Sequence, residues 1–254
     1  MAGKIAYFIL SEDEIHLSYS ENDHFQWIEK FSFANKTDFY YKEQLQQLID
    51  KHNFHNSEYE EHLLMWYSPV STLIPMNLLE NSNPKTLLEY SFSDQKLQYD
   101  ADYNRIPELS IINIYEIPLW VKSFFVMRFP KIVMQHLGTG LIRGIFNTGS
   151  FKPTVHLFLA KQYALMLFVK HNELKLYNSF EYSNENDLIY YTLNALTQVD
   201  ALNDSGAIIL HSLADDYSAI TEAFTANWAK LIDGQNFKTE IQKVQTLNYL
   251  ATCV

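Results

Sequence analysis

Two stretches of this chain match each other without a gap: FSFANKTDFYY at Phe31–Tyr41 and FEYSNENDLIY at Phe180–Tyr190. They lie 149 positions apart, and a Phe, an Asn, an Asp and a Tyr coincide. Apolar positions upstream match at the same offset, with Phe8, Leu10, Leu17 and Tyr19 falling on Leu157, Leu159, Met166 and Phe168. Since the identities and the surrounding pattern agree, the sequence indicates a duplicated module.

Each copy begins with three short segments rich in Ile, Tyr and Phe and separated by polar turns, which is typical of strands. A helix, a buried strand and a second helix are expected to follow. The first copy has expected strands at Ile5–Leu10, Glu14–Tyr19, Phe25–Phe33 and Leu63–Tyr67, and a helix near Pro75–Glu80. The second has them at Thr154–Leu159, Tyr163–Lys170, Glu173–Tyr182 and Ala207–His211, then a helix over Asp216–Ile232, a strand over Phe237–Val244 and a tail helix from Leu247.

A shared Asn-x-x-Asp pattern stands where the first helix of each copy is expected to begin. Asn35 and Asn184 occupy the N-cap position, and Asp38 and Asp187 follow three residues later. An acid at that spacing can accept a hydrogen bond from the amide of the cap residue, which completes a capping box. The pattern is therefore interpreted as helix capping rather than as catalysis.

The first copy carries an insertion at about residues 85–150. A hairpin is expected from Leu87–Phe92 and Lys96–Tyr99, followed by an irregular stretch through Arg105–Pro107. Further expected elements are a strand at Ile111–Ile117, a helix at Leu119–Phe129, a strand at Ile132–His136 and a helix at Thr139–Phe146. Gly, Ser and Pro cluster at Asn147–Pro153, which is typical of a domain junction.

Three strands followed by alternating helices and strands predict an α/β fold of the mixed α+β kind, with helices on the faces of a mixed sheet. Two tandem ribonuclease H-like βββαβα modules are expected. The first lobe is predicted at residues 1–150, including the inserted hairpin and the extra βα elements, and the second at residues 151–254.

Composition and charge exclude several classes of function. A formal charge of −11 argues against binding nucleic acid or an anionic membrane, because both need clustered Lys and Arg. The single cysteine, Cys253, allows neither an internal disulfide nor a thiolate metal site. The N-terminal apolar run is too short for a signal peptide, and no stretch is long enough to span a membrane, so a cytoplasmic protein is expected.

The layout of two βββαβα modules, with extra βα elements before the second, resembles the actin-like ATPase superfamily. The nearer likeness is to the bacterial branch that includes the division protein FtsA, the type IV pilus protein PilM and the cytoplasmic part of the secretion protein GspL. The run IPELSIINIYEIP at Ile106–Pro118 and the later segment Tyr177–Tyr191 are similar to a bacterial family of unknown function with an actin-like fold. The resemblance covers nearly the whole chain.

The resemblance implies nucleotide-binding turns that this sequence lacks. In active relatives, glycines let backbone amides approach the phosphates, and an Asp orients Mg²⁺. The corresponding turns here, Ser11–Glu14 and Ala160–Tyr163, contain no glycine, and neither does the later segment His211–Asp216. The first turn would also place three acids against a polyphosphate. We therefore expect a degenerate member of the superfamily that binds no ATP of the family's kind and carries no cofactor.

One glycine cluster, QHLGTGLIRG at Gln135–Gly144, runs from an expected strand into an expected helix. Such a turn can bind an anion at the helix N-terminus, and the weak candidates for that role are Gly138, Thr139, Gly140 and Arg143. The spacing matches neither a Walker nor a dinucleotide motif. Close packing, with Thr139 as the helix cap, is the favoured alternative. By position, Gln135 or His136 would be the residue that orients an attacking water in active relatives.

Other constellations predict no site. The polar stretch at His52–His62 contains His52, His55 and His62 with Glu58, Glu60 and Glu61, but its spacing matches no metal site, so no metal is predicted. No nucleophile elbow is present, so no catalytic residue is assigned. Paired tyrosines, Tyr40-Tyr41 and Tyr190-Tyr191, are each expected to place one ring inward and leave the other partly exposed.

The sequence thus predicts a non-catalytic actin-like protein that binds a protein partner or associates with itself. The expected interface is the insertion at Leu87–Ile117 or the region of the paired tyrosines, with Tyr99 and Tyr191 as candidate anchors. The alternative is an ATPase-like protein that binds a nucleotide or another phosphate ligand in the cleft between the lobes.

Overall fold

The computed structural model describes residues 3–22, 24–93, 96–149, 151–201, 205–212, 218–232, 239–245 and 250. The chain divides into two compact units, Met1–Gly140 and Leu141–Val254. The division falls within helix α4, which spans Leu137–Thr148. The sequence analysis placed the boundary at residues 150–151, in the loop after this helix. Each unit is described by itself.

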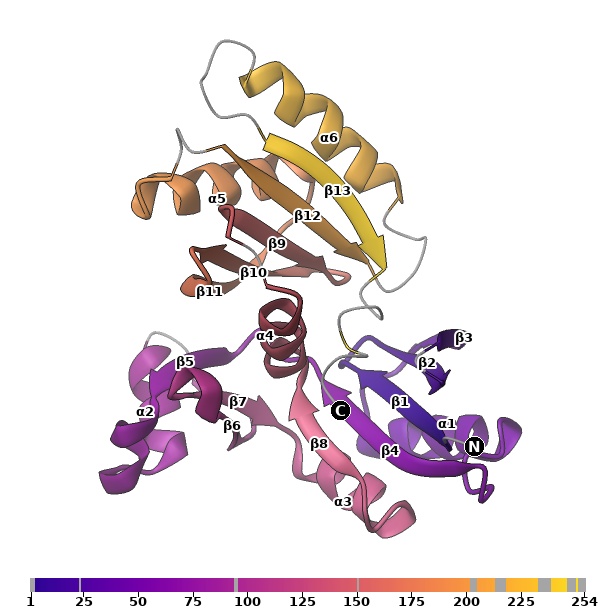
Figure 1. Ribbon diagram of the computed structural model, residues 1–254. Helices are drawn as coiled ribbons and strands as arrows, with labels where there is room; N and C mark the ends of the chain where they lie inside the picture. Colours follow the sequence, from indigo (N-terminus) through magenta and orange to yellow (C-terminus); the bar gives the residue numbers. More distant parts are fainter. Residues whose placement is uncertain are drawn as a thin grey trace. The chain divides into compact units, whose positions relative to one another are not determined.

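Unit 1 is built on a five-stranded sheet in the order β3-β2-β1-β4-β8 (Figure 1). The five strands are β1 (Lys4–Leu10), β2 (Glu14–Glu21), β3 (His24–Ser32), β4 (Tyr59–Trp66) and β8 (Val133–His136). The first three form an antiparallel meander, whereas β1, β4 and β8 run parallel. Helix α1 (Asp38–Lys51) connects β3 to β4, and α3 (Leu119–Arg128) leads into β8. The strands expected in the first copy are all found.

Unit 2 contains a second five-stranded sheet, in the equivalent order β11-β10-β9-β12-β13. Its strands are β9 (Thr154–Leu159), β10 (Tyr163–Lys170), β11 (Glu173–Glu181), β12 (Gly206–Ser212) and β13 (Thr239–Gln245). Helix α5 (Glu185–Gln198) follows the meander, and α6 (Ser218–Ile232) connects β12 to β13. The order of strands and helices confirms the prediction of two βββαβα modules. Most of the predicted tail helix lies outside the described residues.

The repeat in the sequence is also a repeat of hydrogen bonds. Adding 149 to the bounds of β2 gives those of β10, and the same shift relates β3 to β11. In unit 1 the Ser11 amide donates to the Glu14 carbonyl over 2.9 Å, and in unit 2 the Ala160 amide donates to the Tyr163 carbonyl over 2.9 Å. The turn between the first two strands of each sheet is therefore closed in the same way.

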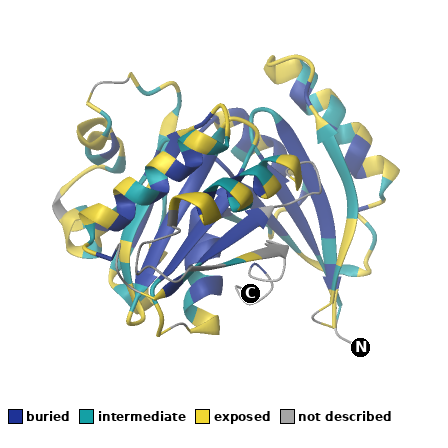
Figure 2. Cartoon of the chain, turned by 90° about the horizontal axis from the view of Figure 1, so that it is seen from above, coloured by how far each residue is buried: buried dark blue, intermediate teal, exposed yellow. Residues whose placement is uncertain are grey.

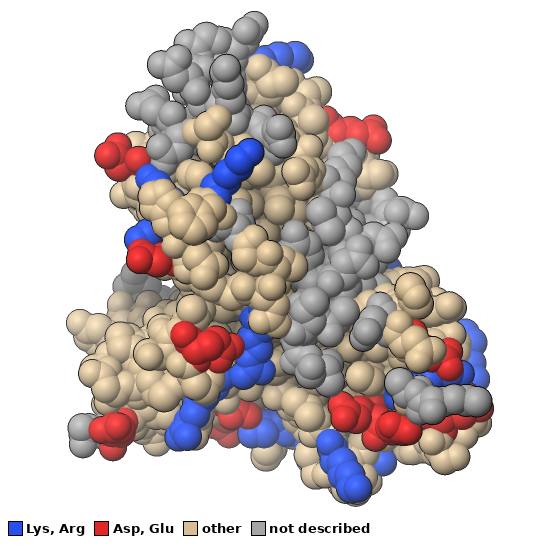
Figure 3. All heavy atoms as spheres, viewed as in Figure 1, with Lys and Arg blue, Asp and Glu red and all other residues tan. Residues whose placement is uncertain are grey.

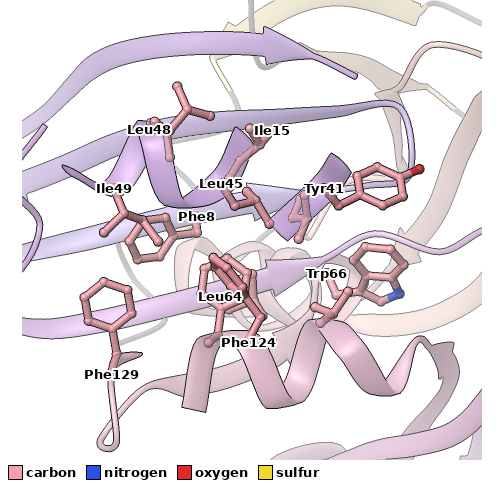
Figure 4. Close-up of a cluster of buried hydrophobic side chains, with 14 of the residues drawn as sticks. Phe8, Ile15, Tyr41, Leu45, Leu48, Ile49, Leu64, Trp66, Phe124 and Phe129 are labelled. Carbon is pink, nitrogen blue, oxygen red and sulfur yellow. The ribbon is translucent and has the colours of Figure 1, made fainter. Parts of the chain in front are cut away.

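The core of unit 1 lies between one face of its sheet and the two helices α1 and α3 (Figure 4). Alternate residues of β1 point to this face, because side chains of a strand alternate between its two sides. Phe8 lies at the centre, with ring centroids 4.9 Å from Phe54 and 5.3 Å from Phe125. Trp120 of α3 stacks on Tyr41 of α1 at 4.9 Å, which ties the two helices together.

The core of unit 2 follows the same plan. Leu157 of β9 and Met166 of β10 are buried in one cluster with Leu188 of α5 and with Phe224 and Trp228 of α6. Figure 2 shows the consequence for burial: the strands are mostly dark blue, and the helices carry yellow on their outer sides. Burying a large apolar side chain contributes about 1.5–3 kcal/mol, so these clusters stabilise both units.

The insertion of unit 1 forms a three-stranded antiparallel sheet in the order β5-β7-β6. Its strands are β5 (Ser71–Pro75), β6 (Asp100–Ile106) and β7 (Ile111–Ile117), joined by the short helices η1 (Met76–Asn81), α2 (Pro84–Ser91) and η2 (Pro107–Leu109). Strand β7 was predicted, whereas β5 was missed. The helix expected near Pro75–Glu80 is the 3₁₀ helix η1.

The hairpin predicted at Leu87–Phe92 and Lys96–Tyr99 is wrong. The first segment belongs to helix α2, whose N-cap Asn83 accepts a hydrogen bond from the Lys85 amide and whose first residue is Pro84. Leu88 is buried against the three-stranded sheet, so one apolar side chain is enough to hold this short helix in place. The stretch through Arg105, predicted to be irregular, is strand β6.

One of the two predicted helix caps is confirmed. The Asn184 side chain accepts from the amides of Asn186 and Asp187, and Asp187 completes the capping box of α5. The prediction for Asn35 is wrong: the N-cap of α1 is Thr37, whose hydroxyl accepts from the Tyr40 amide. The loop before α1 is two residues longer than the loop before α5, so the identities in the sequence do not align the two caps.

None of the helices in the described part of the chain has the length and apolar character that crossing a bilayer would require.

Candidate functional site

Three parallel strands of unit 1 end at the same row of residues. Leu10 of β1 pairs with Trp66 of β4, and Trp66 pairs with His136 of β8. Ligands of open α/β sheets bind beyond the carboxyl ends of the strands. The strand-end site is defined here as the segments that follow this row, namely the turn Ser11–Glu14, Ser68 and the segment His136–Thr139, together with Asn104 and Asn113 of the insertion.

The backbone amides of the turn Ser11–Glu14 are hydrogen-bonded within the turn. The Ser11 hydroxyl oxygen accepts from the backbone nitrogens of Asp13 and Glu14, each 3.2 Å away. In a phosphate-binding turn these amides would point at the ligand. Here a side chain two and three residues earlier takes both hydrogen bonds, which makes a closed turn without glycine.

The acids of this turn are held by neighbouring groups. Lys36 lies 3.0 Å from the Asp13 carboxylate, and the Tyr41 hydroxyl donates to the Glu12 carbonyl over 2.8 Å. Tyr99 of the insertion donates its hydroxyl to the Glu12 side chain. Burial, followed by this hydrogen bond, raises the pKa of Tyr99. Tyr99 is therefore half-buried and engaged, rather than an exposed aromatic ring.

Glu14 points to the other side of β2, into a buried cluster of charges. Its carboxylate lies 2.8 Å from Nε2 of His16 and 2.9 Å from Nζ of Lys30. Burial alone would raise the pKa of Glu14, but the hydrogen bonds and charges of His16 and Lys30 outweigh it and lower the pKa to about 2. Glu14 is thus an ionised, paired carboxylate at neutral pH.

His136 is the centre of the second half of the strand-end site. Its Nδ1 atom lies 3.0 Å from the Gly138 amide nitrogen and 3.1 Å from Nδ2 of Asn113. Its Nε2 atom lies 2.9 Å from the carbonyl oxygen of Ser68. Because both neighbours of Nδ1 are donors, Nδ1 accepts, and the network assigns the proton to Nε2, which donates to Ser68.

His136 is neutral and has no nitrogen left for chemistry. The ring is fully buried, and burial lowers its pKa to about 4. Both ring nitrogens are engaged with Ser68, Asn113 and Gly138. A general base needs a lone pair within reach of a substrate proton, and this geometry gives it none. The arrangement fixes the loop after β4, the insertion and the start of α4 to one another.

Asn104 completes this network from strand β6. Its Oδ1 accepts from the His136 amide over 2.7 Å and from the Thr139 hydroxyl over 3.2 Å. Its Nδ2 donates to the Met134 carbonyl over 3.3 Å. One carboxamide therefore satisfies both a donor and an acceptor of β8, as a neighbouring strand would.

The residues predicted for anion binding are placed as follows. Helix α4 begins at Leu137, so Gly138, Thr139 and Gly140 lie in its first turn, and Arg143 follows one turn later and is half-buried. The Gly138 amide donates to His136. The prediction of Thr139 as the helix cap is wrong, because Thr139 lies inside the helix and its hydroxyl bonds to Asn104 and Asn113 of the insertion.

Sequence reasoning missed three residues of the strand-end site: Ser68, Asn104 and Asn113. A signal was present for one of them, since Asn113 interrupts the apolar run IINIYEI at Ile111–Ile117. A fully buried polar residue in such a run must find hydrogen-bond partners. The partners themselves lie far away in the sequence.

Unit 2 holds a different arrangement. In its first turn, Ala160–Tyr163, the Ala160 carbonyl accepts a hydrogen bond from the Tyr182 hydroxyl over 2.7 Å. The buried rings of His156 and His211 lie side by side on β9 and β12, with Nδ1 of the former 2.9 Å from Nε2 of the latter. Burial lowers the pKa of His211 to about 3, so this residue is neutral. Much of the segment His211–Asp216 lies outside the described residues.

The histidines of the polar stretch at His52–His62 are used separately. His52 bonds to Glu29 at 2.6 Å, His62 to the Phe54 carbonyl at 2.9 Å, and His55 stacks on Phe129 at 4.9 Å. Among the residues that the structure describes, no three His, Cys, Asp or Glu side chains are grouped as metal ligands.

Solved structures share this fold. A Bacteroides thetaiotaomicron protein with an actin-like ATPase fold and unknown function has a TM-score of 0.80 at 19% identity, over 99% of this chain and 96% of that one. The PilM–PilN type IV pilus biogenesis complex contains a chain with a TM-score of 0.53 at 8% identity, over 96% of this chain and 89% of that one. The predicted actin-like ATPase fold is confirmed.

A comparison with curated proteins finds no match. The match to a family model covers residues 7–226, from the fourth residue of β1 to the middle of α6. That span includes the insertion, the whole strand-end site and nearly all of the first module, and it reaches into the last helix of the second. The chain therefore belongs to the family described as protein of unknown function, DUF3822.

Proposed function

We propose that this protein is a non-catalytic member of the actin-like fold that acts as a protein-binding module in the cytoplasm. One observation carries the proposal. The amides of Asp13, Glu14 and Gly138, which stand where the fold would present donors to phosphates, donate instead to Ser11 and His136. A nucleotide would have to break these hydrogen bonds before it could use the same amides.

Breaking them is unfavourable for two further reasons. A hydrogen bond of this kind contributes about 0.5–1.5 kcal/mol, and three of them would be lost, two to the Ser11 hydroxyl and one to Nδ1 of His136. The carboxylates of Glu12 and Asp13 would also face the negative charge of a polyphosphate, with Lys36 already shared between them. Both effects oppose nucleotide binding in unit 1.

A protein-binding role agrees with what the fold does elsewhere. The similar chain of the PilM–PilN complex assembles with another protein. In this chain, Tyr90 of α2 is 85% exposed and Tyr190 of α5 is 64% exposed. One tyrosine of this pair packs inward, as expected, but it is Tyr191, the candidate anchor, whose ring lies 4.2 Å from that of Phe180, and the exposed ring is that of Tyr190. Exposed aromatic side chains supply the contact area on which interfaces depend.

Calorimetry and thermal melting of the full chain test the proposal. We expect no binding heat with MgATP or MgADP and no change in melting temperature. A ligand present at about a hundred times its dissociation constant would stabilise the protein by about 2.7 kcal/mol, so specific binding would be visible. Micromolar binding of MgATP, or hydrolysis that Asp13→Ala abolishes, would show that the proposal is wrong.

The same experiment addresses the phosphate-ligand alternative, in which Gly138, Thr139, Gly140 and Arg143 bind an anion. Inorganic phosphate and pyrophosphate serve as probes. Stabilisation by either that is lost in Arg143→Gln, with Lys161→Gln as a matched control, would replace the proposal by this alternative. Unchanged melting with every probe favours the protein-binding module.

A further inference from the structure

Helix α3 carries apolar side chains on two opposite sides. One side carries Trp120, Val121, Phe124 and Phe125, which are buried in the core of unit 1. The opposite side, toward solvent, carries Leu119, Val126 and Met127 together with Ser123. A surface helix normally places polar residues on the side that faces solvent.

The outer side of α3 is exposed in this chain. Leu119 is 69% exposed, Val126 49% and Met127 79%, and Val133 at the start of the next strand is 53% exposed. The helix positions recur at intervals of three, four and seven, so the side chains form one stripe. Large apolar side chains that gather on one face mark an interaction site more often than isolated ones do.

The charged residues of α3 and of the turn after it are all basic. Within unit 1, residues 117–140 contain three Lys or Arg and no Asp or Glu. Lys122, Arg128 and Lys131 lie on α3 or in the turn after it. Figure 3 shows Lys and Arg atoms at the lower end of unit 1, where α3 and this turn lie.

The Arg128 side chain is held in place by contacts with Phe124 and Gln46. Its guanidinium lies 3.6 Å from the centre of the Phe124 ring, Nη1 donates to the Phe124 carbonyl over 3.0 Å, and Nε donates to the Gln46 side chain. Both oxygens are neutral, and the nearby Asp50 carboxylate attracts the guanidinium through its charge. A guanidinium fixed in this way binds a carboxylate at a low cost in conformational entropy.

Lys122 contributes less, since its ammonium pairs with Asp102 at 2.7 Å. Lys131 is exposed at the end of the stripe. The stripe therefore combines three apolar side chains, one fixed guanidinium and one free ammonium group. Interfaces favour Met, Arg and aromatic residues at their centres.

We propose that the outer side of α3 is a docking surface for an acidic protein segment that carries apolar side chains beside Asp or Glu. This inference rests on the proposed protein-binding role and names its surface and the chemistry of its partner. The apolar side chains would cover Leu119, Val126 and Met127, and a carboxylate would pair with Arg128.

A membrane surface fits these observations less well. Helices that lie on membranes place many Lys and Arg around an apolar face and bind anionic lipid. The chain as a whole carries a charge of −11, which such a surface repels.

Selection from a random peptide library on the immobilised full chain tests the inference. The library is passed over wild type alone, and the binding of the enriched peptides is measured with purified protein. We expect them to combine Asp or Glu with Leu, Ile, Phe or Trp. Met127→Glu and Arg128→Gln should each weaken their binding by about tenfold or more. Raising the salt from roughly 50 to 300 mM should weaken it as well.

Three controls accompany these measurements. Tyr90→Glu adds the same charge at another exposed apolar side chain of unit 1 and should leave binding unchanged. Melting temperatures of the variants should match that of wild type, because Met127 is 79% exposed. Met127→Lys, which removes the apolar contact but not the positive charge, should weaken binding less than Met127→Glu.

Four outcomes would overturn the inference. Two concern the peptides: they lack acidic residues, or they bind Met127→Glu as well as they bind wild type. The other two concern the protein without peptide: wild type binds phosphatidylserine vesicles, or it associates with itself, and Met127→Glu loses that property. Peptides that depend on Tyr90 instead would leave the protein-binding module standing and refute only the α3 surface. Binding of MgATP would refute the module itself, whatever the peptides do.

Discussion

The amide nitrogen of Gly138 lies 3.0 Å from Nδ1 of His136 and donates a hydrogen bond to the ring of the residue two positions before it. The turn between β8 and α4 thereby supplies its own acceptor for a helix amide that would otherwise face a ligand or water. Ser11 does the same for Asp13 and Glu14 in the turn between β1 and β2. Two turns at the strand ends of unit 1 are thus closed by side chains of their own.

Replacing Asn104 by alanine should destabilise unit 1 strongly. The substitution leaves the His136 amide, the Thr139 hydroxyl and the Met134 carbonyl without their partner. We expect the free energy of unfolding to fall by about 2–4 kcal/mol, since each buried group that loses its partner costs about 1–3 kcal/mol. Urea denaturation measures the loss. Asn178→Ala, at an exposed position of β11, is the control and should change stability by less than about 0.5 kcal/mol.

Stability should fall as the pH decreases from about 6.5 to about 4. Burial lowers the pKa of His136 to about 4 and that of His211 to about 3. In this pH range the two histidines are therefore protonated in the unfolded chain but neutral in the folded chain. Each of these histidines then contributes up to about 1.4 kcal/mol per pH unit in this window, and its contribution is fully present above the unfolded pKa.

His136→Gln tests the pH dependence directly. The variant should be less stable than wild type at pH 7, because hydrogen bonds to Ser68 and Gly138 are disturbed. The difference between the two proteins should shrink toward pH 5, where wild type loses stability and the variant does not titrate at this position. Measurements between pH 5 and 7 avoid Glu14, whose pKa is lowered to about 2. Parallel curves for both proteins would refute the role assigned to His136.

The two predicted caps should behave differently on substitution. Asn184→Ala removes the acceptor of two amides at the start of α5 and should cost about 0.5–2 kcal/mol of unfolding free energy. Thr37→Ala should cost a similar amount, whereas Asn35→Ala should have little effect because Asn35 lies before the cap of α1. Equal losses for Asn35→Ala and Thr37→Ala would contradict the assignment of the cap.

Gly206 at the start of β12 should not tolerate a side chain. A Cβ atom there would lie 2.4 Å from the Pro153 carbonyl oxygen, which also accepts from the Ala207 amide at 3.0 Å. Gly206→Ala must therefore displace backbone, and we expect a loss of more than about 2 kcal/mol in urea denaturation.

Gly149→Ala is the comparison. Its φ is +62°, but nothing lies within 4 Å of the added atom, so the substitution should cost only the roughly 1–2 kcal/mol of left-handed backbone. A smaller loss for Gly206→Ala than for Gly149→Ala would show that the contact with Pro153 yields easily.

The meanders could be predicted from the sequence because each strand is a short apolar run bounded by polar turns. In β10, six consecutive residues from Ala164 to Val169 are buried, and the duplicated pattern located both ends of the strand. Helix α2 could not be predicted in this way. It has eight residues and one buried apolar side chain, Leu88, so its short apolar run looks like a strand.

Most of the strand-end site could not be predicted, because its contacts join distant parts of the chain. His136 was identified from its position after an expected strand. Its partners Ser68 and Asn113 are 68 and 23 residues away, and no local pattern connects them. The same holds for the cap of α1, where an identity at Asn35 concealed the two extra residues before Thr37.

The carboxamide of Asn104 has a further consequence for how the first sheet can grow. It occupies the outward hydrogen-bonding groups of Met134 and His136 on β8, so no additional strand can pair there. Exposed borders of sheets recruit strands from other chains, in complexes and in aggregates alike. Within this sheet, that risk falls to the opposite edge, β3, where the pairing with β2 shifts register between Leu17 and Ser18 of β2. The Asn104 side chain thus prevents a strand of another chain from pairing with this edge of the sheet.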